Sequence, residues 1–336
     1  MNDLSKPTIY DIATKAAASP STVSAVLNGS WKKRRIGAET ADRIRQVARE
    51  LGYSANIQAR ALRTTKSGIV GMILPQHDNS FFASLSQAFT EASRERGAMP
   101  AIISTRRDRD QEVDSLWNLI GYSVDALMIV GAKAHDELHE ICRDANVPHV
   151  FVDQPCNAAP SVVSDNAAGV EELTLAILDR AGAEIGEEIY FLGGDSHLYA
   201  SRKRIEGFQA ALRQAGLPAI EDRVLACGYS RTASFYSLQD LYGRLGRLPK
   251  GLIINSMGCF EGTLEFLSEL PEQEIAMCHF GVWDYDPIAA LCRISMPMIR
   301  QKAEVMIRKA FVHLDARDTA PSLTKIKPEL ILPRTL

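Results

Sequence analysis

The pattern of apolar residues changes abruptly at Gly68, and this change constrains the fold more than any other feature of the sequence. Before Gly68, no stretch has the alternating pattern of a strand, and three short stretches have apolar residues at helical spacing. After it, short apolar runs alternate with amphipathic helical stretches, which is typical of parallel strands joined by crossover helices. The sequence therefore predicts a small helical head and a large α/β body.

The head has clear signals for the ends of three helices. Thr8 and Ser19 are N-cap residues placed before apolar periodic stretches, and Pro20 suits the first position of the second helix. The third helix is expected to run for about thirteen residues and to end at Gly52. Three helices of this size can enclose one small core.

The body has more strands than one open sheet comfortably holds, so we expect two α/β lobes with a ligand cleft at their facing strand ends. The expected strands are residues 69–74, 99–104, 126–130, 149–152, 188–192, 224–227, 251–254 and 276–280. The expected helices include residues 82–96, 167–181, 201–215 and 232–245.

The charge, like the pattern of apolar residues, differs between the head and the body. Residues 1–66 contain twelve Lys and Arg against five Asp and Glu, a net charge of +7, whereas the rest of the chain carries −10. A basic head on an acidic body is typical of a protein whose head binds a polyanion.

Several classes of protein are not expected. The chain has no apolar run long enough to cross a membrane and no apolar core of a signal peptide near Met1, so we expect a cytoplasmic protein without membrane contact. The six cysteines are at least fourteen residues apart, which excludes a C-x-x-C pair. They are interpreted as reduced, small apolar residues.

No enzyme motif stands out. Gly193 and Gly194 follow a strand, but neither G-x-G-x-x-G nor G-K-[ST] follows them, and G-x-S-x-G does not occur. His135 and His139 have a zinc-compatible spacing, yet the sequence offers no evident third ligand. We therefore expect no catalysis, no cofactor and no metal.

The first two helices form a candidate helix-turn-helix. A tight turn at residues 17–19 joins them, and Ser21, Thr22, Ser24 and Ala25 are expected to face outward from the second helix. Any small helical bundle has this periodicity, but the positive charge of the head favours DNA binding.

These residues resemble the LacI family of bacterial transcription regulators, and the fructose and sucrose repressor subgroup in particular. The resemblance rests on residues 8–13, 19–24 and 26–29 and continues through the body, for example at 164–166 and 300–301. It implies a helix-turn-helix head with a two-lobed, periplasmic-binding-protein-like body. One departure is Ala17, which stands where the family usually has Gly, so the turn is expected to be strained or altered.

The resemblance implies domain bounds. Residues 1–53 would form the DNA-binding domain, 54–67 a linker with a short helix, and 68–336 the effector-binding and dimerisation domain. Within this body, one lobe would comprise about 68–163 and 296–322, and the other about 164–295 and 323–336.

The resemblance also implies a homodimer, or alternatively a tetramer, on a pseudo-palindromic double-stranded operator. Leu62 would insert into the minor groove and kink the duplex, or alternatively would pack on its own body. The basic run at 32–35 would contact phosphates, or would be a solvated loop. The expected DNA-contacting residues are Thr8, Tyr10, Ser19, Pro20, Ser21, Thr22, Ser24, Ala25, Asn28, Lys32, Lys33, Arg34, Arg35, Asn56, Ala59, Arg60 and Leu62.

For the body, the resemblance implies a sugar or sugar-phosphate effector, with fructose or a fructose phosphate the first expectation. Arg106 and Arg107 could add donors for a phosphate. The expected effector-binding residues are Asn79, Ser80, Phe82, Asp153, Arg202, Arg204, Ser256 and Asp284. The overall prediction is a ligand-responsive regulator, and specifically a repressor, of carbohydrate genes. The alternative is a cytoplasmic sugar-binding or sugar-processing protein whose head serves oligomerisation.

Overall fold

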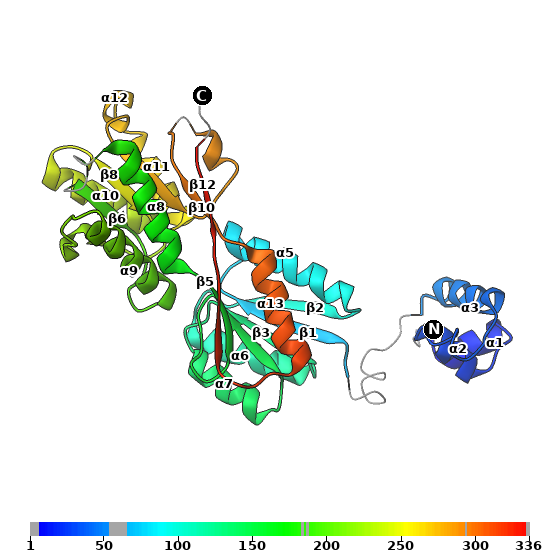
Figure 1. Cartoon of the computed structure of the whole chain (residues 1–336). Helices are drawn as coiled ribbons and strands as arrows, with labels where there is room; N and C mark the ends of the chain where they lie inside the picture. The colour runs from blue at the N-terminus through cyan, green and yellow to red at the C-terminus, as the bar shows by residue number, and fades with distance from the viewer. Residues whose placement is uncertain (1–6, 54–65, 183–184, 186–187, 293, 334–336) are drawn as a thin grey trace. The chain divides into compact units, whose positions relative to one another are not determined.

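The computed structural model describes residues 7–53, 66–182, 185, 188–292 and 294–333, and the chain forms two compact units (Figure 1). The first unit is Met1–Ser67 and the second is Gly68–Leu336. The division falls where the predicted linker ends. In the described part of the chain, no helix is long and apolar enough to span a membrane.

The head contains the three predicted helices, α1 (Ile9–Lys15), α2 (Pro20–Leu27) and α3 (Ala38–Glu50). Thr8 caps α1 through a capping box with Asp11, and the Ser19 side chain accepts a hydrogen bond from the backbone N–H of Thr22 at the start of α2. The predicted caps are therefore confirmed. The helices enclose one core, built from Ile12, Ala13, Ala16, Val23, Val26, Ala41, Ile44, Val47 and Ala48.

The turn between α1 and α2 is strained at Ala17. Its φ of +47° lies in the left-handed region, where a β-carbon crowds the backbone. The turn is closed by a hydrogen bond from the N–H of Ala18 to the carbonyl of Ala13. The strain expected for an alanine at this position is thus present.

The first lobe of the body is a six-stranded parallel sheet in the order β11-β5-β4-β3-β1-β2. Its strands are β1 (Ile69–Leu74), β2 (Met99–Ser104), β3 (Ala126–Val130), β4 (His149–Val152), β5 (Pro160–Ser164) and β11 (Ser322–Ile326). Apolar side chains of α5 (Ser80–Glu95) and α13 (Ala303–Ala316) pack on one face. Those of α6 (Arg109–Gly121) and α7 (His135–Asp144) pack on the other (Figure 1).

The second lobe has a sheet in the order β12-β10-β9-β8-β6-β7, in which β12 alone runs antiparallel to its neighbour. Its strands are β6 (Ile189–Leu192), β7 (Val224–Leu225), β8 (Gly251–Ile254), β9 (His279–Trp283), β10 (Met298–Arg300) and β12 (Glu329–Ile331). The larger helices are α8 (Asn166–Ala181), α9 (Tyr199–Gln214), α10 (Arg231–Leu245) and α11 (Met257–Leu267). Short helices are η2 (Glu221–Arg223), α12 (Glu272–Ile275) and η3 (Ala289–Leu291). Each sheet is covered on both faces, as buried parallel strands require.

The predicted lobe bounds are wrong near the C-terminus. Residues 296–322 were expected in the first lobe, yet β10 belongs to the second sheet; residues 323–336 were expected in the second, yet β11 belongs to the first. The chain crosses between lobes after β5, after β10 and after β11. All three crossings are predicted, but the last two are placed a few residues too early, because β10 has only three residues and β11 is largely exposed, so neither has an apolar run that marks its end.

Most of the other strand and helix predictions are confirmed. The bounds of β1, β2, β3, β4 and β8 are those predicted, and the four predicted helices begin and end within two residues of those observed. The strand expected at 276–280 is wrong in position, since β9 covers His279–Trp283. The fully buried β5 was not predicted.

We predict that Ala17→Gly stabilises the head by about 0.5–1 kcal/mol. Removing the β-carbon relieves a left-handed strain of roughly 1–2 kcal/mol, which exceeds the added entropy of an unfolded glycine, about 0.5–1 kcal/mol. Amide hydrogen exchange of the core helices in the full chain should slow by about two- to fivefold. The matched variant Ala38→Gly, at the exposed start of α3, should speed exchange instead. Faster exchange in Ala17→Gly would contradict the strain.

Candidate nucleic-acid surface and ligand cavity

The exposed end of α2 has three hydroxyl groups gathered at its N-terminus. Ser19 Oγ lies 2.8 Å from both Ser21 Oγ and Thr22 Oγ1, and Pro20 beside them is exposed. The first backbone N–H groups of a helix carry partial positive charge and suit contacts with anions. This end of α2 can therefore offer hydroxyl donors and acceptors together with a favourable dipole.

Ala25 does not share this surface, which corrects the expectation that it faces outward. Its exposed fraction is 2%, because the turn after α2 folds back on it. The Ser30 hydroxyl donates a hydrogen bond to the Ala25 carbonyl over 3.4 Å. The helical period had placed Ala25 beside Ser24, but the buried arc of α2 is wide enough to include it.

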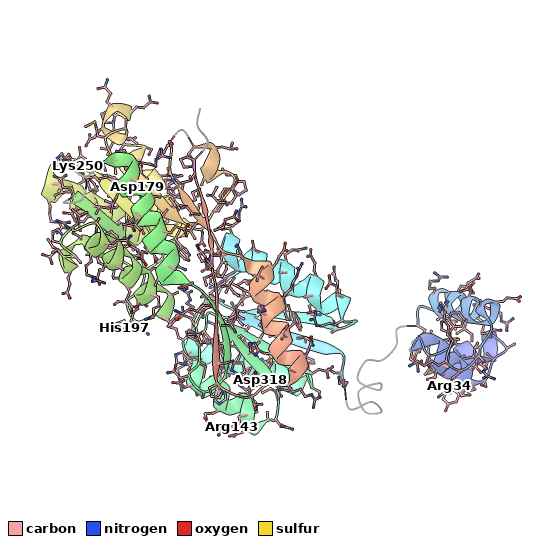
Figure 2. The ribbon with its side chains drawn as sticks, viewed as in Figure 1. Arg34, Arg143, Asp179, His197, Lys250 and Asp318 are labelled. Carbon is pink, nitrogen blue, oxygen red and sulfur yellow. The ribbon has the colours of Figure 1, made fainter. Side chains whose placement is uncertain are left out.

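A basic turn at residues 32–35 projects from the head. All four of its cationic side chains, Lys32, Lys33, Arg34 and Arg35, are exposed, and Figure 2 shows Arg34 on the outside of the head. Trp31 anchors the turn, packing against the head core with the guanidinium of Arg45 over its ring at 5.3 Å. The turn is thus a fixed structure, with its charges held towards solvent.

The remaining expected DNA-contacting residues fall into two groups. Thr8, Tyr10 and Asn28 are exposed, Tyr10 to 72%, and Ser24 is half-buried. Asn56, Ala59, Arg60 and Leu62 lie outside the described residues.

A cavity of about 400 Å³ lies between the lobes of the body. It brings together six of the eight predicted effector residues, which are Asn79, Phe82, Asp153, Arg204, Ser256 and Asp284. It is also lined by Arg106 and Arg107, which the sequence suggested as phosphate donors, and by Gln76, Lys133, Asp195, Tyr229 and Gln301, which were not predicted. These last residues lie just after strand ends or at the start of a crossing between the lobes. This position in the sequence is the signal that could have identified them as cavity residues.

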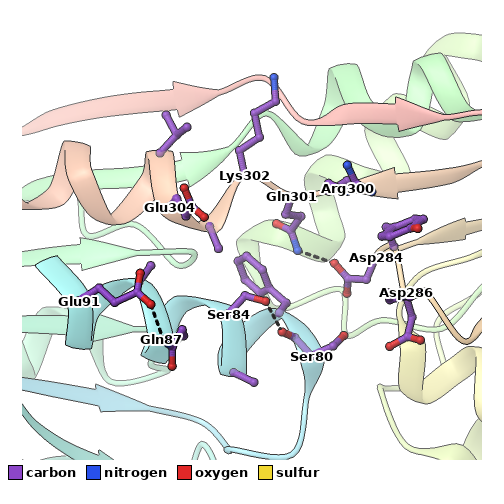
Figure 3. A pocket seen from close by; sticks show the side chains of 17 residues that line it. Ser80, Ser84, Gln87, Glu91, Asp284, Asp286, Arg300, Gln301, Lys302 and Glu304 are labelled. Atoms are coloured by element: carbon purple, nitrogen blue, oxygen red, sulfur yellow. Dashed lines mark hydrogen bonds between the residues drawn. The ribbon is translucent and has the colours of Figure 1, made fainter.

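Two predicted residues are not in this cavity. Ser80 lines a neighbouring cavity of about 810 Å³, beside Ser84 and the exposed face of α5 (Figure 3). Arg202 is exposed, and its guanidinium donates to the carbonyl of His197 over 3.0 Å. The structure places neither residue in the interlobe cavity, because each is two positions away from an inward-facing residue, Phe82 or Arg204, and such positions point to nearly opposite sides of a helix.

Arg204 is a buried cation held from several sides, with an exposed fraction of 4%. Its guanidinium stacks over the Trp283 ring at 4.1 Å. Its Nε donates to Asn166 Oδ1 and its Nη1 to the Asn255 carbonyl, each over 2.8 Å. These contacts fix the plane of the guanidinium at the cavity wall.

Two carboxyl groups, Asp153 and Asp284, accompany this cation. Both are buried, and both have left-handed backbone, with φ of +72° and +81°. Burial raises the pKa of both, that of Asp284 to about 6, while the charge of Arg204 opposes the increase. Carboxylates in such a site are suited to accept hydrogen bonds from hydroxyl groups.

A chain of hydrogen bonds connects Asp284 to a crossing between the lobes. Gln301 Nε2 donates to Asp284 Oδ1 over 2.7 Å (Figure 3), and the Ser164 hydroxyl donates to Gln301 Oε1 over 2.6 Å. Ser164 ends β5 and Gln301 follows β10, so both are at crossings. These hydrogen bonds therefore connect the Asp284 carboxyl to two places where the backbone crosses between the lobes.

Other contacts join the two walls directly. The guanidinium of Arg107 from the first lobe lies 5.6 Å from the Phe82 ring and 5.1 Å from the Tyr229 ring of the second lobe. Gln154 Oε1 accepts from the N–H of Tyr199 over 2.9 Å, also across the cleft. The two lobes are therefore held together by contacts at the cavity rim.

Both the head and the body of the chain are similar to known proteins. Residues 8–56 match the family described as bacterial regulatory proteins, lacI family, and residues 67–255 match periplasmic binding proteins and sugar binding domain of LacI family. The chain is 40% identical to the ribitol operon repressor of Klebsiella aerogenes, over 66% of this chain and 86% of that protein. It is 33% identical to the sucrose operon repressor of Klebsiella pneumoniae, over 78% of each.

A solved structure is similar over nearly the full length. The lac repressor dimer bound to operator and the anti-inducer ONPF has a TM-score of 0.79, at 18% identity over 97% of both chains. At this identity the similarity concerns the fold.

We predict that Asp284→Asn stabilises the body at pH 8 by about 1–3 kcal/mol. The wild-type carboxyl has a raised pKa, so its stabilising contribution is complete below its ordinary value of 3.8 and is lost as the pH rises through about 6. The advantage of the asparagine should thus shrink between pH 8 and pH 5, as measured by urea unfolding. Asp179→Asn, at an exposed site on α8, is the control. A benefit of Asp284→Asn that does not depend on pH would contradict the assignment.

Proposed function

The chain belongs to the LacI family of bacterial regulatory proteins, and on this premise we propose that it represses a carbohydrate operon under the control of a small ligand. The head would bind a pseudo-palindromic operator as part of a dimer, and the body would bind the effector between its lobes. The observation that carries the proposal is the combination, in one chain, of an exposed hydroxyl-rich helix end with a polar interlobe cavity. The relatives are regulators, and we propose no catalytic step.

On the head, we propose that α2 enters the major groove with Ser21 and Thr22 nearest the bases. Thr8, Tyr10 and Asn28 would contact phosphates and set the register. Ala25 is buried and is left out of this surface, so the bases are read mainly by hydroxyl groups at the start of the helix. Such groups discriminate bases less sharply than a bidentate arginine, so phosphate contacts should supply much of the affinity.

The linker is proposed to follow the family arrangement implied by its sequence. Leu62 would be the minor-groove wedge, with Asn56, Ala59 and Arg60 beside it. These residues lie outside the described part of the chain, so the proposal rests on their sequence alone.

For the body, we propose a small carbohydrate with adjacent hydroxyl groups as the effector. Asp153, Asp195 and Asp284 would accept hydrogen bonds from hydroxyls, and the Phe82 ring would cover an apolar face of the ligand. The names of the relatives point to ribitol and sucrose operons; fructose is similar in size to ribitol and is one of the two units of sucrose. We therefore propose a neutral sugar or sugar alcohol as the first candidate.

A phosphorylated sugar such as fructose phosphate is the second candidate, because cations gather on one wall. Arg106, Arg107 and Lys133 all line the cavity from the first lobe and could neutralise a phosphate. Arg202 is not available for this purpose, since it lies outside the cavity. The two candidates differ in charge: only the phosphorylated sugar would bind Arg106, Arg107 and Lys133 through a negatively charged group.

A panel of ribitol, D-fructose, fructose 1-phosphate and sucrose tests the effector proposal by thermal shift. A ligand at about 100 times its Kd should stabilise the body by about 2.7 kcal/mol. Asp153→Asn should abolish most of this shift, whereas Ser80→Ala, in the neighbouring cavity, should retain it. If no carbohydrate of the panel shifts the transition, or if Ser80→Ala abolishes the shift, the proposed ligand or its site is wrong.

The DNA proposal predicts a dependence on salt. Replacing Lys33 and Arg34 together by alanine should reduce the slope of log affinity against log salt by about two on an operator fragment. Arg308→Ala, an exposed cation on α13 of the body, should leave the slope unchanged. An unchanged slope in the double variant would show that the basic turn is only a solvated loop. Affinity without salt dependence in the wild type would favour a head that serves oligomerisation.

A further inference from the structure

A cluster of three potential metal ligands lies in the first lobe, outside the lining of the interlobe cavity. His135 and Asp136 begin α7, and Cys156 is in the segment between β4 and β5. One ligand atom from each residue lies within 4.8 Å of the other two. His135 Nδ1 is 2.9 Å from Asp136 Oδ1, and the Cys156 thiol donates to the same oxygen over 3.7 Å.

These separations are close to those of a tetrahedral site. With bonds to zinc of about 2.0–2.1 Å from nitrogen or oxygen and about 2.3 Å from sulfur, ligand atoms lie about 3.3–3.6 Å apart. The separations of His135 and Cys156 from Asp136 are on either side of this range, and the His135–Cys156 pair lies within 4.8 Å. Rotation of exposed Asp136 and half-buried His135 would bring the three ligand atoms to these separations. A set of one nitrogen, one sulfur and one oxygen favours Zn²⁺ over Mg²⁺ or Ca²⁺, which prefer oxygen alone.

The sequence suggests His135 and His139 as a pair of metal ligands, but His139 does not belong to this cluster. His139 instead lies with its Nδ1 2.8 Å from Nε2 of His149. The third ligand comes from Cys156, twenty residues beyond Asp136, and only the adjacency of the β3 and β4 ends brings it close.

The Cys156 ligand is in a fixed segment. Its backbone N–H donates to Ser161 Oγ over 3.1 Å, and the same hydroxyl is 3.2 Å from the Cys156 carbonyl. The loop before α7 is also anchored, because the buried Glu112 carboxylate accepts from the N–H groups of Lys133 and Ala134. The side chains are therefore presented by backbone that is already ordered, which lowers the entropy cost of binding an ion.

We propose that His135, Asp136 and Cys156 bind one divalent transition-metal ion, of which Zn²⁺ suits the ligands best, with water at the fourth position. Binding would replace the thiol proton of Cys156, which passes to the solvent, and would leave the oxidation states of the ion and of the sulfur unchanged.

Such an ion would connect two segments of the interlobe cavity. Lys133 is two residues before His135 and Asp153 is three residues before Cys156, and both line the cavity. A metal bridge between the segments would restrict the positions of these two side chains. This consequence for the effector rests on the proposed function, whereas binding of the ion does not.

The test uses the full-length chain treated with a chelator and then titrated with Zn²⁺ by calorimetry and with Co²⁺ by absorbance. We expect one saturable site, release of about one proton per ion at a pH below the thiol pKa, and a thiolate-to-cobalt charge-transfer band. Cys156→Ser should remove the band, and both Cys156→Ser and His135→Ala should weaken binding at least about tenfold. Cys292→Ser and His197→Ala, outside the cluster, are the matched controls and should bind as the wild type does.

Hydrogen exchange supplies a readout that depends on neither DNA nor carbohydrate. Zn²⁺ should slow exchange in residues 131–136 and 153–156 of the wild type and leave these segments unchanged in Cys156→Ser. Circular dichroism verifies that the variants fold. The absence of saturable binding, or Zn²⁺ binding by Cys156→Ser equal to that of the wild type, would overturn the site. Binding without slower exchange would overturn the bridge between the segments.

Discussion

The arrangement of the body depends on how one buried cation is accommodated. Arg204 has an exposed fraction of 4%, and its buried charge is compensated because Trp283 lies under its guanidinium and the side chain of Asn166 and the main chain of Asn255 accept its hydrogen bonds. Asp153 belongs to the other lobe, and its electrostatic interaction with Arg204 crosses the cleft. The strength of this interaction thus depends on the relative position of the lobes, and a ligand whose hydroxyl groups bind the carboxylates would change it.

Control of DNA binding requires a ligand with different affinities for two states of the body. The structure offers elements that such a ligand can bias. Gln301 connects Asp284 to the crossing after β10, and Arg107 reaches from one lobe to Tyr229 on the other. Because these contacts are few and at the cavity rim, a carbohydrate can replace or strengthen them without disturbing either core. Their rearrangement would alter the population of operator-binding dimers in the proposed regulator.

The sequence predicts well those features in which burial and local signals agree. Thr8 and Ser19 cap their helices as predicted, and the central strands are apolar runs with clear ends. The failures occur where burial is decided by distant segments. The exposed edge strand β11 has no apolar signal, and Ala25 is covered by a turn whose position depends on Trp31. Six of the eight effector residues implied by the resemblance line the cavity, whereas the direction of a side chain on a helix, as for Arg202, differs between positions only two residues apart.

The central claim is that the polar cavity and the DNA-binding head are coupled in one regulator. The direct measurement is the Kd of the effector for the full-length chain, determined by calorimetry with and without a saturating operator duplex, alongside the operator Kd with and without effector. Thermodynamic linkage requires both ratios to be equal, and we expect a factor of about 5 to 150. An effector affinity that is the same with and without operator would contradict the account.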